Sequence, residues 1–386
     1  MITHIEIEGF KSLKKVALDL GGLNIFIGTN ASGKSNFFEA LRVLQGIGYG
    51  FTISEIFDGK PKSATGEVWE GIRGGSALAS FRNSAVAEPS LRIVRFTVKL
   101  KAEGLDQPLT YSIAIDTGEA QIRSERLWVG ENLENLIFGE QLASVPGNLT
   151  VPMLALAPLP DVFGVQLTKI CRALLADTQV LDPAAENLRD YSKVPQARRM
   201  GDRGENFAGL VSSILPQDAT TSAYTSWLKQ LTPAELDEVV LLRGALKEPL
   251  FAFKKGNQAI PASILSDGTL RFAAIAAAFF QPDMPRTLLI EEIETGLHPT
   301  RLRLLLELLR SQSVNGTPQV MATSHSPQVL AWLTEDDYKT TFLCRKDEET
   351  GASTIIPLSE VPGFLDLARK QPASDLFAEG WLEGAL

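Results

Sequence analysis

The chain has 386 residues and a net charge of −9, which allows more than one lobe around a large core and works against protein-wide attraction to nucleic acid. Three histidines argue against a zinc centre, and two distant cysteines, Cys171 and Cys344, are typical of buried residues in a reducing compartment. The longest dense apolar run, residues 272–280, is too short to cross a bilayer, and residues 1–7 alternate like a strand and not like a signal peptide. We therefore expect a cytoplasmic protein with no membrane partner.

The first third reads as strands that lead into a glycine loop and a helix. Strands are expected at residues 3–9, 15–20 and 23–27, and the last of these runs into the pattern G-x-x-x-x-G-K-S. A helix should begin near Gly33 and end in the glycines of residues 46–50. A glycine-rich stretch, residues 66–75, follows. Alternating runs then predict an antiparallel sheet, and they cover residues 91–101, 110–116 and 121–129.

The glycine loop has the context of a phosphate site, because a strand precedes it and a helix follows it. Gly28 and Gly33 let successive main-chain N–H groups converge on a phosphate. Lys34 supplies a positive charge for the β- and γ-phosphates, and the Ser35 hydroxyl suits Mg²⁺. The sequence thus predicts ATP and Mg²⁺ as ligands. The predicted nucleotide-binding residues of this loop are Gly28, Asn30, Ala31, Ser32, Gly33, Lys34, Ser35 and Asn36.

The middle of the chain, residues 151–242, consists of short helical patterns without a sustained heptad repeat. This pattern favours a compact helical lobe over a coiled-coil arm. Thr-Pro-Ala-Glu at residues 232–235 has the form of a capping box with proline at the first helical position, so a helix is expected to begin there.

The last third returns to α/β order, with two strands that end in polar residues. Helices are expected within residues 265–280, 300–312 and 326–333, strands at 287–290 and 319–323, and a hairpin from 340–345 and 353–358. Glu291 and Glu292 end the first strand. Beside a glycine loop, the first acid would hold Mg²⁺ and the second would orient the attacking water.

Two further motifs suit a phosphate ligand. Ser266 or Asp267 can cap the helix that begins in Leu-Ser-Asp-Gly-Thr, and its free N–H groups make a second anion site, which a second subunit's γ-phosphate would explain. His325 ends the strand of residues 319–323 and can donate to a γ-phosphate and sense its loss. The tight loop of residues 294–299 suits a subunit contact.

With these motifs in place, the sequence resembles the ABC-type ATPase heads of the SMC and RecF group, closest to stand-alone relatives akin to the ATPase half of OLD-type proteins. The resembling motifs are GTNASGKSN, LSDGTLR, LLIEEIETGLHP and ATSHSP, in the family's order. The resemblance implies an α/β P-loop NTPase with a mixed central sheet, a flanking antiparallel sheet and an inserted helical lobe.

The resemblance also implies that two heads close face to face around two ATP molecules, as a homodimer. Ser266, Asp267 and Gly268 would then touch the ATP held by the partner. Glu292 would be the general base, Glu291 the acid on the Mg²⁺ side, with Ser35, and His325 the γ-phosphate switch. The family usually has aspartate at the position of Glu291, so the division of roles between the two acids stays open. The glutamine-loop residue has no clear match; the positions considered are Gln45, Gln107 and Arg73.

We therefore expect an N-terminal ATPase lobe at residues 1–150, a helical insertion at 151–245 and a C-terminal ATPase lobe at 246–386. The leading hypothesis is an ATPase that acts by ATP-dependent head dimerisation. Its resemblance to this family places it in DNA maintenance or antiviral defence. DNA or a separate effector protein would be a further partner. The alternative is a nucleotide-gated regulatory module with little turnover of its own. A nuclease and a transporter motor are less favoured, because no cluster of metal ligands and no transporter-type signature loop is present.

Overall fold

The computed structural model of the chain describes residues 1–60, 69–82, 92–130, 136–141, 150–156, 162–232, 234, 236–314, 316 and 318–384. Its chain forms two compact units. The first comprises Met1–Thr178 and Thr334–Leu386, and the second comprises Gln179–Leu333. The beginning of the expected glycine-rich stretch, residues 66–68, lies outside the described residues.

A six-stranded antiparallel sheet forms one side of the first unit, in the order β2-β1-β4-β5-β6-β7. Buried positions alternate with more exposed ones along β4, as a sheet with one buried face requires. The strand bounds are β1 Ile2–Phe10, β2 Leu13–Asp19, β4 Ile93–Leu100, β5 Leu109–Asp116, β6 Gln121–Val129 and β7 Leu136–Gln141. The predicted antiparallel sheet is confirmed.

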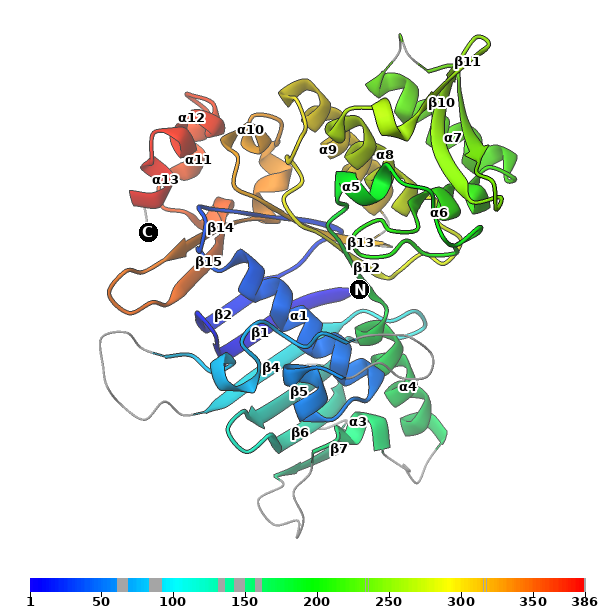
Figure 1. Cartoon of the computed structure of the whole chain (residues 1–386). Coiled ribbons are helices and arrows are strands. Elements are labelled where there is room, and N and C mark those ends of the chain that lie inside the picture. The colour runs from blue at the N-terminus through cyan, green and yellow to red at the C-terminus, as the bar shows by residue number, and fades with distance from the viewer. Residues whose placement is uncertain are drawn as a thin grey trace. The chain divides into compact units, whose positions relative to one another are not determined.

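Two helices, α1 (Lys34–Tyr49) and α4 (Val162–Ala176), lie side by side against this sheet (Figure 1). They approach closely where Gly48 meets the α4 backbone, because a Cβ there would lie 2.5 Å from the Ala176 nitrogen. The short helices α2 (Ile53–Asp58) and α3 (Met153–Leu156) complete this layer. The predicted glycine end of α1 is confirmed, since Gly50 caps it in the left-handed conformation.

The first unit also contains three strands in the order β15-β14-β3. β3 (Leu23–Ile27) runs parallel to β14 (Thr341–Lys346), and β14 forms the predicted hairpin with β15 (Ser353–Pro357). Phe26 of β3 stacks on Phe342 of β14, with ring centroids 4.9 Å apart. The last helices of the unit are α11 (Phe364–Ala368), α12 (Ala373–Ala378) and α13 (Trp381–Gly384).

The second unit is built around parallel strands β12 (Thr287–Ile290) and β13 (Gln319–Ser324), with β8 (Thr178–Leu181) beyond β12. Every residue of β12 and β13 is buried, which explains why both strands read as short apolar runs without alternation. The helices α8 (Asp267–Ala278), α9 (Pro299–Ser313) and α10 (Pro327–Leu330) belong to this part of the unit (Figure 1). The expected strands and helices here are confirmed.

The remainder of the second unit holds a smaller antiparallel sheet in the order β11-β10-β9. Its elements are α5 (Ala185–Leu188), α6 (Phe207–Ile214), α7 (Asp218–Leu231), β9 (Glu238–Arg243), β10 (Pro249–Lys255) and β11 (Gln258–Pro261). The helix expected to begin at residues 232–235 is wrong. The Thr232 hydroxyl donates to the Leu228 oxygen, so Thr232 ends α7, and the chain then enters β9. Pro233 and Glu235 lie outside the described residues.

The two compact units divide the chain differently from the lobes expected from sequence character. α3 and α4 of the expected helical insertion belong to the first unit, whereas α5, α6, α7 and β9 belong to the second. Among the described residues, no helix is long and apolar enough to cross a membrane.

Candidate functional site

The loop after β3 has the backbone that a phosphate-binding loop needs. Gly33 has φ +108°, and Ala31 adopts the left-handed region at φ 64°, which is uncommon outside glycine. A Cβ on Gly28 would lie 2.2 Å from the Cys344 oxygen, and one on Gly33 would lie 2.4 Å from the Ser353 Oγ. Both glycines are therefore required by close packing against β14 and β15.

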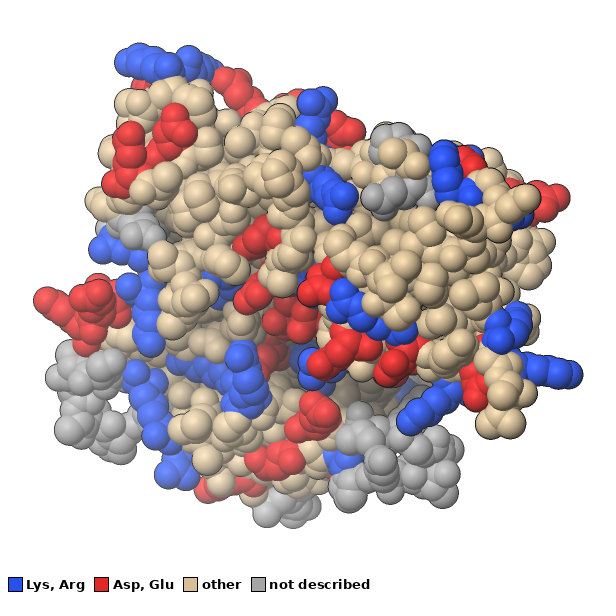
Figure 2. Space-filling model, turned by 45° about the horizontal axis from the view of Figure 1, so that its top comes forward, with Lys and Arg blue, Asp and Glu red and all other residues tan. Residues whose placement is uncertain are grey.

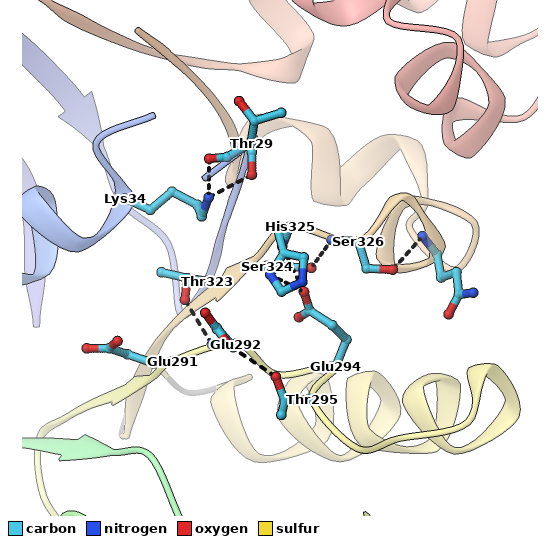
Figure 3. A network of polar contacts seen from close by, with 12 residues as sticks. Thr29, Lys34, Glu291, Glu292, Glu294, Thr295, Thr323, Ser324, His325 and Ser326 are labelled. Atoms are coloured by element: carbon cyan, nitrogen blue, oxygen red, sulfur yellow. Dashed lines mark hydrogen bonds and ion pairs between the residues drawn. The ribbon is translucent and has the colours of Figure 1, made fainter. Parts of the chain in front are cut away.

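Lys34 is buried inside the curl of this loop. Its Nζ donates to the main-chain oxygens of Gly28 at 2.6 Å and Thr29 at 2.8 Å, and it lies 3.4 Å from the Ser32 Oγ (Figure 3). These contacts hold the ammonium group beside the loop backbone. The positive charge is thereby positioned for an anion bound by the loop.

The N-terminus of α1 suits an anion. Gly33 is its N-cap and offers no side chain, and the first turn contains no acidic residue. The helix dipole and the N–H groups of the first turn are therefore not offset by a carboxylate. Ser35 is partly exposed in this turn, whereas the Asn36 amide donates to the Ser12 Oγ at 2.7 Å. Asn36 thus fastens α1 to the β1–β2 turn.

A cavity of about 650 Å³ adjoins the loop within the first unit. It is bounded on one side by residues 29–32 and on the other by the end of β14 and the turn that follows it, within residues 344–351. Its size falls within the range of small-molecule sites. Burial raises the pKa of the Cys344 thiol to about 12 despite the nearby positive charge of Lys34, so this thiol is neutral and unreactive.

In the second unit, Glu291 and Glu292 follow β12, as expected from the sequence. Glu292 is exposed and has φ 46°, a strained conformation for a residue with a side chain. Its N–H donates to the Thr323 Oγ at 3.0 Å, and the Thr295 Oγ lies 3.2 Å from its Oε2. Figure 3 shows the Glu291 carboxylate pointing away from the Glu292 side chain and its two threonine partners. The turn thus presents the two carboxylates in different directions.

His325, at the end of β13, is held by a residue that the sequence reading did not single out. The Glu294 Oε1 accepts the His325 main-chain N–H at 2.8 Å and lies 3.1 Å from the ring Nδ1 (Figure 3). The Glu294 side chain is only 10% exposed, whereas that of His325 is 44% exposed. Two acids separated by one residue, Glu292 and Glu294, were the available sequence signal.

The loop of residues 265–268, within the motif LSDGTLR and called the signature loop below, lies against the turn that follows Glu294 in the second unit. Ser266 is the N-cap of α8 and accepts the Thr269 N–H at 3.3 Å, which confirms the predicted cap. Asp267 forms an ion pair with Arg189 at 2.5 Å. A Cβ on Gly268 would lie 2.1 Å from the Gly296 oxygen. Only glycine allows this approach, so the two loops are packed to move together.

Arg271 of α8 is a second functional candidate that the sequence reading did not select, although it lies within the quoted signature motif. Its guanidinium is buried and donates to the main-chain oxygens of Glu291 at 2.7 Å and Pro183 at 2.8 Å. It also forms an ion pair with Asp182 at 3.1 Å. The signature helix is therefore joined directly to the turn that carries the two acids.

The three glutamine-loop positions have other contacts. The buried Gln45 amide donates to the Thr178 oxygen at 2.6 Å, and Gln107 is exposed in the β4–β5 turn. The Arg73 Nε donates to the Glu39 Oε1 at 2.8 Å, and Lys11 also pairs with Glu39. Gln45 is thus a structural residue of the first unit.

Positive and negative side chains lie close to one another over much of the face drawn in Figure 2. In the arginine-rich stretch of residues 196–203, Arg198 makes a bidentate pair with Asp283, and Arg203 approaches Glu186 at 3.6 Å. Neutralised arginines are less suited to phosphate backbones. This arrangement agrees with the interpretation of the stretch as an ordinary surface.

Comparisons with known proteins agree with the two halves of this arrangement. Residues 1–57, which include the glycine loop, match the family "AAA ATPase domain". Residues 235–331, which include the signature, both acids and His325, match the family "AAA domain, putative AbiEii toxin, Type IV TA system". An Smc head domain of Pyrococcus furiosus, solved with the C-terminal domain of ScpA, aligns with 95% of this chain and 99% of its own at a TM-score of 0.53 and 12% identity.

These matches identify the chain as an ATPase. It is also similar to the "ATP/GTP phosphatase" of Helicobacter pylori (strain ATCC 700392 / 26695), at 21% identity over 371 residues, which span 90% of this chain and 93% of that protein. The likeness to the Smc head confirms the expected fold class. It shows the fold alone at this level of identity. The ATPase family matches confirm the expected class of enzyme.

Proposed function

We propose that this ATPase works by ATP-dependent closure of two heads, with hydrolysis reopening them. The observation that carries the proposal is the buried Lys34 ammonium beside the uncapped N-terminus of α1, a pair that suits the phosphates of a nucleotide. The adjoining cavity offers room for the rest of a nucleotide.

Magnesium is the metal that fits this set of residues. Mg²⁺ prefers oxygen ligands and is commonly held by one or two protein oxygens together with substrate phosphates and water. Among the described residues, no group of three or more His, Cys, Asp or Glu forms a cage of its own. We assign the Ser35 hydroxyl and the Glu291 carboxylate as the protein ligands; bound there, Mg²⁺ would neutralise charge on the phosphates.

Glu292 is the proposed general base. Its strained backbone and the contacts from Thr323 and Thr295 give its carboxylate a defined direction, which a group that activates water needs. His325 is the proposed γ-phosphate sensor.

The signature residues Ser266, Asp267 and Gly268 are proposed to meet the ATP of a second copy of the chain. The N-terminus of the 12-residue helix α8 offers N–H groups to an anion, and Arg189 offsets the charge of Asp267. Gly268 packs on Gly296, and Arg271 reaches the turn that carries Glu291. Binding of a second phosphate at the signature residues would therefore change the positions of the two acids. This coupling would link dimer closure to hydrolysis.

The wider setting follows from the relatives alone. A cytoplasmic role in DNA maintenance or antiviral defence is proposed because one relative is an Smc head bound to ScpA, and one matched family is described by a toxin of a Type IV TA system. The further partner would be DNA or a separate effector protein. A regulatory module with little turnover is the second candidate. It is favoured by the exposed position of Glu292, because a general base must hold one attacking water in a fixed place, which would require closure of the heads.

The proposed chemistry is tested by phosphate release from Mg-ATP at saturating nucleotide. The wild-type protein should turn over, Lys34→Ala should lose both binding and turnover, and Glu292→Gln should bind ATP and release almost no phosphate. If Glu291→Gln behaves in that way and Glu292→Gln turns over, the assignment of the base is wrong. Binding without turnover by the wild-type protein would favour the regulatory module.

A further inference from the structure

The contact between Glu294 and His325 has a feature that main-chain support alone does not explain. The Glu294 Oε1 accepts the His325 main-chain N–H at 2.8 Å and also lies 3.1 Å from the ring Nδ1 of the same residue. A carboxylate only 10% exposed, at the end of an apolar strand, would normally be costly.

The second oxygen of the same carboxylate sharpens this point. Among the described residues, the Glu294 Oε2 is buried and has no hydrogen-bond partner. An unpartnered buried carboxylate oxygen carries a desolvation cost, which a neutral apolar residue would avoid. The cost is offset where the carboxylate faces a group that carries positive charge, and in this structure the contacting group is the His325 imidazole.

We propose that Glu294 is a positioning residue, which fixes the His325 ring so that Nδ1–H faces Glu294 and Nε2 is the free edge that meets phosphate. The inference rests on the proposed role of His325 as γ-phosphate sensor. Because imidazole donates from both nitrogens only when it is protonated, His325 would take up a proton on Nε2 as the phosphate arrives. Glu294 stabilises that cation through Nδ1–H.

The histidines of the chain supply their own controls for a spectroscopic test. There are three, His4, His298 and His325. The His298 Nδ1 faces two donors of Thr300, the main-chain N–H at 3.4 Å and the hydroxyl oxygen at 3.0 Å, an arrangement that favours an unprotonated Nδ1. His4 lies between two carboxylates, with Nδ1 2.6 Å from Asp19 and Nε2 3.2 Å from Glu6. Each imidazole should thus give a different pattern of protonated nitrogens.

The first experiment is long-range ¹H–¹⁵N correlation NMR on the full chain labelled with ¹⁵N-histidine, without nucleotide, and His325→Asn assigns the signals. We expect Nδ1 of His325 to be protonated, and His298 to show the opposite tautomer with its proton on Nε2. A His325 ring whose Nδ1 is unprotonated would overturn the proposal without recourse to a Glu294 variant. Since no nucleotide is present, this outcome is independent of whether the protein hydrolyses ATP.

The second experiment separates positioning from structural support. Glu294→Leu removes both acceptors, whereas Glu294→Gln keeps one oxygen that can accept the same two N–H groups. We expect Glu294→Leu to lower kcat by about 10- to 100-fold, the usual cost of losing a group that orients a functional histidine, with little change in the KM for ATP. Glu294→Gln should retain most of kcat. The matched control, Glu307→Leu, removes a surface carboxylate on α9 that pairs with Arg303.

Equal kcat values for Glu294→Leu and Glu294→Gln would assign Glu294 to structural support and overturn the proposal. If the Leu variant does not fold, the wild-type tautomer decides alone. A protonated Nδ1 in a protein that proves unable to hydrolyse ATP would leave the positioning of His325 intact and remove the proposed turnover.

Discussion

The Arg271 guanidinium donates a 2.7 Å hydrogen bond to the main-chain oxygen of Glu291, and so joins the signature helix to the turn that carries both acids. The same side chain reaches the Pro183 oxygen at 2.8 Å, and it is buried. A buried arginine fork with several acceptors is more rigid than an apolar contact, because each bond fixes the direction of the next. We regard this residue as the mechanical link between α8 and β12.

Replacing Arg271 by methionine should therefore destabilise the second unit and lower turnover together. The variant keeps the length of the side chain but strands two buried carbonyl oxygens, at a cost of about 3 kcal/mol. Urea unfolding of Arg271→Met and of the surface control Arg303→Met measures the difference. Equal midpoints for both variants would contradict the assigned role.

Lys34→Ala should abolish nucleotide binding without loss of the fold, since the Lys34 ammonium group donates to the main chain of the loop itself, at Gly28 and Thr29. Calorimetric titration with ATP measures binding. Lys15→Ala removes an exposed lysine from the same unit and should bind ATP normally. Retained affinity in Lys34→Ala would remove the loop from the proposed site.

Ser266→Arg should block association of two heads and spare ATP binding by one head. The substitution combines a lost N-cap, worth about 1 kcal/mol, with a bulky side chain at the surface proposed to meet a second copy. Ser266→Ala loses the hydroxyl without adding bulk and should associate more strongly than Ser266→Arg. If both variants associate equally in Mg-ATP, the signature does not contact a second nucleotide.

Burial of Glu125 should make stability depend on pH in a direction opposite to that of most carboxylates. Burial raises the pKa of Glu125, although the N–H groups of Leu154 and Met153 and the Tyr111 hydroxyl oppose the shift. The folded state then binds more protons than the unfolded state above the ordinary glutamate pKa, so this contribution to stability is present at low pH and is lost as pH rises through the folded pKa.

The free energy of unfolding of the wild-type protein, relative to Glu125→Gln, should therefore fall as pH rises above the ordinary glutamate value. Denaturant unfolding at several pH values measures this difference. A difference that rises with pH would mean that the hydrogen bonds outweigh burial.

Local sequence patterns predicted most of the strands and helices. The strand of residues 287–290 and the helix behind Ser266 were readable because buried parallel strands and capped helices leave strong short-range signals. The helix predicted from the capping-box pattern at Thr232 was wrong, because a threonine that ends one helix gives the same sequence pattern as a threonine that begins the next. Only the three-dimensional path of the chain distinguishes the two.

The sequence singled out residues that are proposed to act on a ligand, such as Lys34, and missed residues that contact another residue of the site. Glu294 contacts His325, and Arg271 contacts Glu291, at sequence separations of 31 and 20 residues. Sequence spacing does not predict contacts between residues this far apart in the chain. The division into two compact units was equally hidden, since residues 334–386 return to the unit that holds residues 1–178.

The most direct test of head closure is the mass of Glu292→Gln in solution, measured by size-exclusion light scattering with and without Mg-ATP. ATP bound but not hydrolysed should hold two heads together, so we expect a monomer without nucleotide and a dimer with it. The same mass in both conditions, with ATP demonstrably bound, would contradict closure driven by ATP.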